Sequence, residues 1–198
     1  MDWWYKPQNV RTDGRGALAI DLGRLGPAEY SGGRIDSQGK FDYTRGSIEF
    51  RAHVPPTEGH LAAVWLQADS PGDELGTAAD GAEVDVLESA HQSDTYPVTL
   101  HYDGYGEHHQ SSSEAVRAPG LHGTWYHTFG LEWSESSLRF RYDGQVVREV
   151  TDPKLISRVA EFPIISHEIL EFTDGDVTKA PLDHTSTMYV GYVRVWQG

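Results

Sequence analysis

The amino-acid sequence predicts an all-β protein, and three observations support this fold class. Apolar and polar residues alternate along several short segments, which is the pattern of strands with one buried and one solvated face. Turn-forming residues separate these segments, and the 198-residue chain contains 21 Gly and 10 Pro. No stretch shows a long helical periodicity, and no internal repeat is evident. The length suits one domain that buries its own core.

The first expected strands lie beside turn signals in the N-terminal half of the chain. Residues 17–20 follow an Asp13-Gly14 turn, and two strands are expected on either side of an Arg45-Gly46 turn within residues 39–52. Residues 61–67 form a continuous apolar run, which is typical of a fully buried central strand.

The later strands are expected to follow the acidic strand described below. An Asp143-Gly144 pair between two alternating segments is a hairpin signature. The expected strands are residues 98–102, 125–133, 137–142, 145–148, 163–172 and 188–196.

Residues 81–89 place three carboxylates within one expected strand. Glu83, Asp85 and Glu88 alternate with apolar residues, although Asp and Glu are depleted in strands. A regular strand would turn Glu88 to the opposite face. A β-bulge after Asp85 adds one residue and returns Glu88 to the face of the other two carboxylates.

Three carboxylates on one face have two interpretations. Two carboxyl groups that flank a sugar bond at roughly 5–5.5 Å are the arrangement of a retaining glycosidase. Crowding makes simultaneous ionisation costly, so one group should keep its proton and serve as the acid. The alternative is an exposed strand with a solvated acidic face.

The motif Glu83-x-Asp85-x-x-Glu88 resembles the bulged signature of glycoside hydrolase family 16, which contains laminarinases, agarases and carrageenases. The resemblance implies that Glu83 is the nucleophile and Glu88 the acid/base, while Asp85 assists the pair. It also implies a β-jelly-roll sandwich of two curved antiparallel sheets. Such a fold offers the concave sheet on which a polysaccharide would lie across the acidic strand.

Several further segments are similar to blocks of the same family, in the same order. They are Gly32-Gly33-Arg34-Ile35, Gly39-Lys40-Phe41, residues 125–133 and the closing residues 188–196. The resemblance runs from about residue 5 to residue 197. It implies that residues 1–198 are a single catalytic domain, with an N-terminus that is trimmed or unusually short.

The resemblance also implies a set of substrate-binding residues. Trp65 would face the cleft beside the scissile bond, although a lone Trp in an apolar strand is more often a core residue. His101 and Tyr102 would lie near Glu88, where the histidine could tune the acid or contact substrate. The remaining candidates are Trp125, Arg34 and Asn9.

The substrate is expected to be a β-1,3-glucan or a mixed-linkage β-glucan, cut internally. Leu61 stands where the family often has another Trp, and the turn in residues 101–106 is unusual. Both features keep a β-galactan open as the alternative. A non-catalytic β-glycan-binding module is the third reading, but such modules typically lack the two glutamates that are present here.

The composition limits the kinds of molecule that this protein is expected to bind. The net charge of −14, from 30 acidic and 16 basic residues, argues against nucleic acid. No apolar run is long enough for a membrane span, and no cofactor or catalytic metal is expected, since Glu107-His108-His109 lacks ligand spacing. A structural Ca²⁺ in the acidic loop 174–176 is an open alternative. We expect a monomer that is secreted, with its signal peptide outside this sequence.

Overall fold

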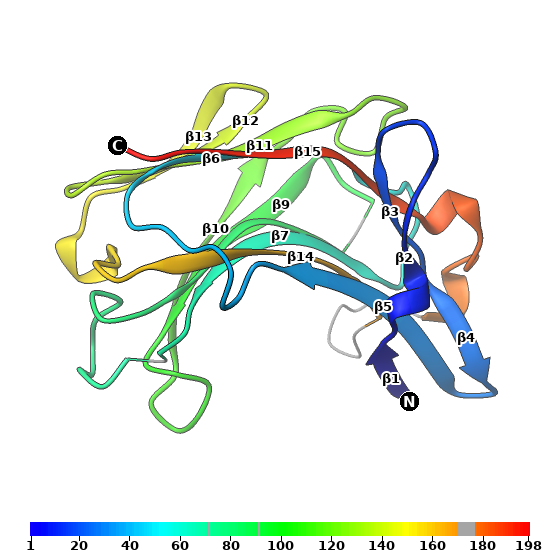
Figure 1. Ribbon diagram of the computed structural model, residues 1–198, viewed down its shortest axis with the longest axis horizontal. Helices are drawn as coiled ribbons and strands as arrows, with labels where there is room; N and C mark the ends of the chain where they lie inside the picture. The colour runs from blue at the N-terminus through cyan, green and yellow to red at the C-terminus, as the bar shows by residue number, and fades with distance from the viewer. Residues whose placement is uncertain (71, 91, 170–176) are drawn as a thin grey trace.

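The computed structural model describes residues 1–70, 72–90, 92–169 and 177–198, and it consists of two stacked β-sheets (Figure 1). The eight-stranded sheet has the order β1-β5-β14-β7-β8-β9-β10, with β4 paired to β5. Its strands are β1 (Asp2–Tyr5), β4 (Gly23–Gly26), β5 (Glu29–Asp36), β7 (Leu61–Ala68), β8 (Glu83–Ser89), β9 (Thr95–Tyr102), β10 (Gln110–Arg117) and β14 (Glu161–Glu168).

The seven-stranded sheet has the order β13-β12-β11-β6-β15-β3-β2. Its strands are β2 (Val10–Thr12), β3 (Leu18–Ile20), β6 (Gly46–His53), β11 (His127–Trp133), β12 (Leu138–Tyr142), β13 (Gln145–Val150) and β15 (Met188–Trp196). In the part of the chain that the structure describes, four short 3₁₀ helices lie between strands, at Pro7–Asn9, Pro153–Leu155, Val177–Lys179 and His184–Ser186. Within the described ranges, no helix has the length and apolarity that a membrane span requires.

The hydrophobic core lies between the two sheets. One buried cluster contains Phe50 of β6 and Phe129 of β11 from one sheet and Val64 of β7 and Leu100 of β9 from the other. All four side chains are fully buried. The alternation in the sequence therefore predicts the inward faces correctly. The fold is the jelly-roll sandwich that the family resemblance implies.

The expected bulge is present in β8. Leu87 lies opposite Val64 of β7, while Asp85 lies opposite Trp65, so Val86 is the additional residue. Val86 and Leu87 are both fully buried. The extra residue reverses the alternation and returns Glu88 to the outward face, which it shares with Asp85.

Most predicted strands are found, with one difference within residues 39–52. Residues 41–44 are not a strand, since Tyr43 makes only an isolated bridge to Glu161. The reason is that β5 and β6 belong to different sheets, so residues 37–45 cross between the sheets instead of forming a hairpin arm. The turn at Arg45 and Gly46 is present, with φ of 68° and 122°.

Differences also occur at the sheet edges and near the C-terminus. Strand β10 escapes prediction because it is an edge strand whose residues are mostly exposed, so its sequence carries no apolar alternation. The hairpin at Asp143-Gly144 is confirmed, with φ of 47° and 78° at its central residues. Residues 170–172 of the expected late strand, and the acidic loop 174–176 considered for Ca²⁺, lie outside the described residues.

A buried carboxyl group makes the stability of this core depend on pH. Glu161 of β14 is 0% exposed, and burial raises its pKa from 4.5 to about 8. The folded state therefore holds this proton more tightly than the unfolded state. Stability from this group is fully present below about pH 4.5 and is lost as the pH rises to about 8.

We expect Glu161→Gln to flatten this pH dependence, because an amide cannot ionise. Melting temperatures measured by circular dichroism between about pH 4.5 and pH 8 should fall less steeply for the variant than for the parent protein. Glu107→Gln, at an exposed position, is the control and should follow the parent. Parallel curves for all three proteins would contradict the assignment.

Candidate active site

The three carboxylates of β8 line one cavity on the outward face of the eight-stranded sheet. A cavity of about 260 Å³ is lined by Tyr5, Arg34, Leu61, Ala63, Trp65, Glu83, Asp85, Glu88 and Glu168. Neighbouring strands set what each carboxylate faces. In the register of β7, Gln67 lies opposite Glu83, Trp65 opposite Asp85, and Ala63 opposite Glu88.

Asp85 lies between the two glutamates and is almost completely buried, with 3% exposed. Burial raises its pKa well above the usual value, and the nearby Glu88 and Glu83 raise it further. Asp85 therefore holds a proton more readily than an exposed aspartate. A protonated Asp85 would remove one negative charge from the cluster and could donate a hydrogen bond to a neighbouring carboxylate.

Glu88 has the properties of a general acid. Burial raises its pKa to about 7, with further contributions from the negative charges of Glu83 and Glu168. The Thr99 hydroxyl of β9 opposes this shift by donating to Glu88 Oε2 at 3.2 Å. Glu88 therefore keeps its proton below about pH 7, where an exposed glutamate would be ionised.

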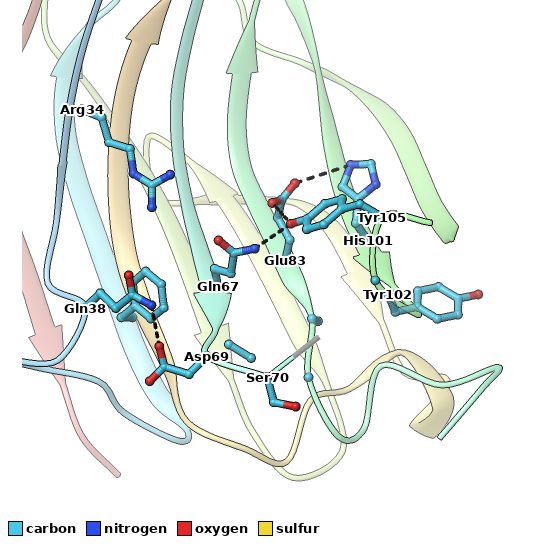
Figure 2. Close-up of a pocket in the computed structure, with 14 residues that line it drawn as sticks. Arg34, Gln38, Gln67, Asp69, Ser70, Glu83, His101, Tyr102 and Tyr105 are labelled. Carbon is cyan, nitrogen blue, oxygen red and sulfur yellow. Dashed lines mark hydrogen bonds and ion pairs between the residues drawn. The ribbon is translucent and has the colours of Figure 1, made fainter. Parts of the chain in front are cut away.

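Glu83 has neighbours that favour its ionised form. Tyr105 donates its hydroxyl proton to Glu83 Oε2, and Gln67 Nε2 donates to the same tyrosine oxygen at 2.7 Å (Figure 2). Burial raises the pKa of Glu83, whereas the Tyr105 hydrogen bond and the positive charge of Arg34 lower it. The shift at Glu83 is thus opposed by more partners than the shift at Asp85.

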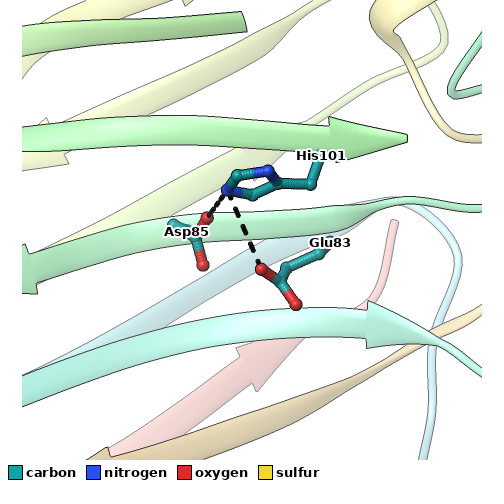
Figure 3. A group of neighbouring side chains, drawn as sticks. All are labelled: Glu83, Asp85 and His101. Atoms are coloured by element: carbon teal, nitrogen blue, oxygen red, sulfur yellow. Dashed lines mark ion pairs between the residues drawn. The ribbon is translucent and has the colours of Figure 1, made fainter. Parts of the chain in front are cut away.

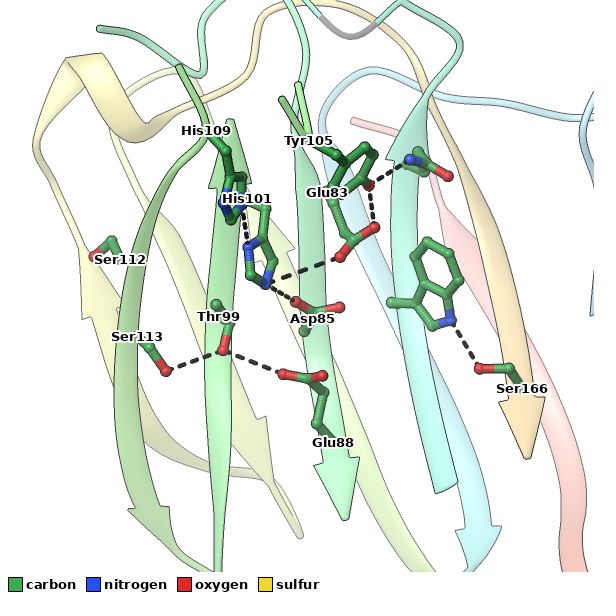
Figure 4. A network of polar contacts seen from close by, with 12 residues as sticks. Glu83, Asp85, Glu88, Thr99, His101, Tyr105, His109, Ser112, Ser113 and Ser166 are labelled. Carbon is green, nitrogen blue, oxygen red and sulfur yellow. Dashed lines mark hydrogen bonds and ion pairs between the residues drawn. The ribbon is translucent and has the colours of Figure 1, made fainter. Parts of the chain in front are cut away.

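His101 of β9 faces Glu83 and Asp85 (Figure 3). Its Nε2 lies 3.4 Å from Asp85 Oδ2 and 3.9 Å from Glu83 Oε1. Its Nδ1 lies 2.9 Å from His109 Nε2, and the two rings stack. Burial lowers the pKa of His101, so the neutral ring prevails near pH 7. The histidine thus lies beside Glu83 and Asp85, whereas Glu88 accepts a hydrogen bond from Thr99 (Figure 4).

Glu83, Asp85 and His101 also have the spacing of a metal-binding group. One potential ligand atom from each lies within 4.8 Å of the others. A cation here would occupy the carboxylate that glycosidase chemistry needs as a nucleophile. The hydrogen bond from Tyr105 already satisfies one oxygen of Glu83. The arrangement fits a carboxylate cluster that is hydrogen-bonded by its neighbours.

A fourth carboxylate, Glu168, closes the cavity from β14. Tyr5 donates its hydroxyl to Glu168 Oε2, and Ser166 Oγ donates to Oε1 at 3.2 Å. Ser166 also accepts Trp65 Nε1–H at 3.2 Å (Figure 4). Burial raises the pKa of Glu168. This network fixes the indole of Trp65 and places Glu168 where its charge acts on Glu88.

Trp65 and Arg34 lie in the cavity, as the family resemblance implies. Trp65 is partly exposed beside Asp85, and the guanidinium carbon of Arg34 lies 5.1 Å from the centre of the Trp65 ring. Arg34 also lines an adjoining cavity of about 190 Å³, together with Gln38, Gln67, Asp69, Glu83, His101 and Tyr105. Glu83 borders both cavities, so together they make one cleft along the sheet.

Three sequence-based placements need correction. Asn9 is buried and donates to Ser31 Oγ and to the Asp21 carbonyl, both at 3.0 Å, so its amide is committed to the interior. Trp125 is 74% exposed and precedes β11 of the other sheet, because the strand begins only at His127. Tyr102 borders the smaller cavity, but its ring points away from Glu83 (Figure 2) and packs partly against the core.

The sequence reasoning missed five residues of the site. Tyr105 lies in the unusual turn of residues 101–106, and His109 belongs to the Glu107-His108-His109 segment, which lacks metal-ligand spacing. Thr99, Tyr5 and Glu168 come from strands whose order in the sheet the sequence does not reveal. The alternation in residues 98–102 puts Thr99 on the same face as His101 and was the one signal that could have found it.

A β-sandwich with a cluster of carboxylates in a cleft on one sheet is an arrangement found in glycoside hydrolases. The model of the glycosyl hydrolases family 16 matches residues 1–187. The chain therefore belongs to glycoside hydrolase family 16, as its carboxylate motif indicates.

Individual relatives are similar over most of this chain. The glucan endo-1,3-beta-glucosidase A1 of Niallia circulans is 28% identical over 86% of the chain, which spans only 27% of that protein. The beta-glucanase of Rhodothermus marinus is 26% identical over 96% of the chain and 71% of its own length. A Bacteroides ovatus mixed-linkage-glucan GH16 structure superposes with a TM-score of 0.79 at 21% identity, covering 97% of this chain and 87% of its own.

The two neighbours of Glu88 should move the pH profile in opposite directions. Glu168→Gln removes a negative charge that raises the pKa of Glu88, so the alkaline limb of kcat/KM should move to lower pH. Thr99→Val removes a donor that stabilises ionised Glu88, so the same limb should move to higher pH.

The measurement is kcat/KM against pH on one soluble substrate, with Glu149→Gln on the opposite sheet as the charge-matched control. The control should leave the limb in place. Limbs that stay fixed in both active-site variants would show that another group, and not Glu88, sets the alkaline side.

Proposed function

We propose that this protein is a retaining endo-β-glycanase that cleaves a β-1,3-glucan or a mixed-linkage β-glucan. The single observation that carries the proposal is the pair Glu83 and Glu88 on one face of β8, with opposite protonation favoured by their neighbours. The names of the Niallia and Rhodothermus relatives support a β-glucan as the substrate. A secreted location, which we expect from the sequence, fits a substrate that is a large polysaccharide.

The proposed first step forms a glycosyl-enzyme. A carboxylate oxygen of ionised Glu83 attacks the anomeric carbon, and the bond from that carbon to the leaving oxygen breaks. Protonated Glu88 gives its proton to the leaving oxygen, so the departing sugar leaves as a neutral alcohol. Tyr105 and Gln67 hold Glu83 in position for this attack.

The second step releases the product. Glu88, now ionised, takes a proton from a water molecule, and the hydroxide equivalent attacks the anomeric carbon. The bond to Glu83 breaks, both glutamates return to their starting states, and the configuration is retained. Asp85 acts between them by keeping a proton within the cluster and limiting its negative charge.

The cleft supports binding of a chain of sugars. Trp65 offers an aromatic face beside the carboxylates, on which the apolar face of a sugar ring can stack. Arg34, Gln38 and Asp69 add polar groups on the Glu83 side. The cleft is open along the sheet, which suits attack within a polymer.

A β-galactan is the second candidate, and Leu61 favours it. Leu61 is 6% exposed in the cavity wall, opposite Glu168 in the register of β14, and it offers no aromatic platform there. Glu168 and Tyr5 make this end of the cleft polar. Polar groups at this end of the cleft could bind hydroxyl groups of a galactan, whereas a tryptophan at the position of Leu61 would offer an aromatic surface there instead.

The proposed activity is tested by reducing-sugar release from laminarin, lichenan, agarose, carrageenan, porphyran and a β-1,3-galactan. We expect activity on laminarin or lichenan, lost in Glu83→Gln and reduced by about 10²–10⁴-fold in Glu88→Gln. Glu149→Gln should keep full activity. Binding to one polymer without cleavage of any would instead support a glycan-binding module.

The stereochemical outcome is a separate prediction. Proton NMR of fresh product should show the β-anomer first, followed by slow mutarotation, because two displacements at one carbon restore its configuration. The α-anomer as the first product would exclude Glu83 as the nucleophile.

A further inference from the structure

A second cavity lies on the outward face of the seven-stranded sheet, on the opposite side of the sandwich from the carboxylates. It measures about 730 Å³ and is lined by Arg11, Asp13, Arg15, Gly16, Ala17, Arg51, His53, Thr124, Tyr126, Tyr189 and Gly191. Arg51 and His53 of β6 alternate with the buried Phe50 and Ala52, which fixes their outward direction. The cavity and the cleft are lined from different sheets, so the core lies between them.

Arg51 is held in place without a carboxylate partner. Its guanidinium carbon lies 4.3 Å from the centre of the Tyr126 ring. Gly191 of β15 makes room for it, since a Cβ there would come within 3.0 Å of Arg51 Nη1. Within the described part of the chain, no carboxylate forms an ion pair with Arg51. The guanidinium N–H groups of Arg51 are thus held in place and can donate hydrogen bonds to a ligand.

The cavity is locally basic in an acidic protein. Among the residues that the structure describes, three arginines line it against one acidic residue. Arg11 pairs with Asp21 at 2.8 Å, and Asp13 Oδ1 is occupied by the backbone N–H groups of Arg15 and Ala17, at 2.7 and 2.9 Å. These backbone contacts leave the negative charge of Asp13 in place, so three arginines against one aspartate give the described lining a net positive charge, although the whole chain carries −14.

One wall of the same cavity is aromatic. The His53 ring lies 6.1 Å from the Tyr126 ring and 6.2 Å from the Tyr189 ring, so three rings follow one another along the wall. Burial lowers the pKa of His53, so its ring is neutral near pH 7. Neutral aromatic faces accept the C–H face of a sugar ring, while guanidinium groups pair with carboxylate or sulfate.

We propose that this cavity, lined by Arg15, Arg51, Tyr126 and Tyr189, is a second binding site that takes an anionic saccharide unit. Arg51 pairs with the acidic group of the sugar, and Arg15 adds charge from the β2–β3 loop. The tyrosines and His53 receive the sugar ring. The site does not depend on the reaction proposed for the cleft, since it shares no residue with it. A polymer that bears uronate or sulfate groups could be held here while another part of it reaches the cleft.

The test is direct binding of three α-linked oligosaccharides, which are unlike the β-glycans proposed for the cleft. Trigalacturonate carries carboxylates, a sulfated isomaltotriose carries sulfates, and plain isomaltotriose is neutral. Isothermal calorimetry should detect binding of at least one acidic probe, weakened by added NaCl, and no comparable binding of the neutral probe. The better acidic probe identifies carboxylate or sulfate as the recognised group.

Variants then locate the site. Arg51→Gln should weaken binding of the acidic probe by about tenfold or more, because charge-assisted hydrogen bonds are lost. Arg194→Gln is the matched control, since Arg194 also stacks on a tyrosine of this sheet, 4.0 Å from the Tyr192 ring, but lies outside the cavity. If Arg51→Gln folds poorly, the binding affinity of Arg15→Gln for the acidic probe tests the same site, since Arg15 lies in an exposed loop.

Three outcomes would overturn the proposal. The first is that neither acidic probe binds at millimolar concentration. The second is that the neutral probe binds as tightly as the acidic ones. The third is that folded Arg51→Gln and Arg15→Gln bind the acidic probe as tightly as the parent and Arg194→Gln do.

Discussion

The additional residue at Val86 is the constraint on which the site depends. Without it, strand periodicity would direct Glu88 into the core, where an unpaired carboxylate is costly. With it, Val86 and Leu87 are both buried and Glu88 joins Glu83 and Asp85 on the outward face. A single change in register thus produces both a continuous core and a line of three carboxylates.

Different hydrogen-bond partners then give these carboxylates different protonation tendencies. All three have raised pKa values because the cleft removes water, but their partners differ. Glu83 receives a proton donor from Tyr105, Glu88 receives only the weaker help of Thr99, and Asp85 is enclosed between them. The partners on neighbouring strands therefore favour an anion at Glu83 and an acid at Glu88, which is the pair that the proposed retaining mechanism uses.

The sandwich keeps two chemically different faces apart. The cavity beside Trp65 gathers four carboxylates, and the opposite face presents Arg15 and Arg51 beside tyrosines. Strand alternation directs each set outward while the apolar residues between them build the core. The net charge of −14 therefore describes the chain as a whole and not each of its surfaces.

The sequence by itself determined the all-β class, most inward-facing residues, the bulge and the three carboxylates. The class and the inward faces follow from local periodicity, because side chains alternate along a strand whatever its neighbours are, and the bulge follows from a glutamate that strict alternation would turn inward. Tertiary structure alone decided that Glu168, Thr99 and Tyr105 meet the carboxylates, since strand order brings together residues far apart in the chain. It also decided against Asn9 and Trp125, whose environments depend on the packing of the first turn and on where β11 begins.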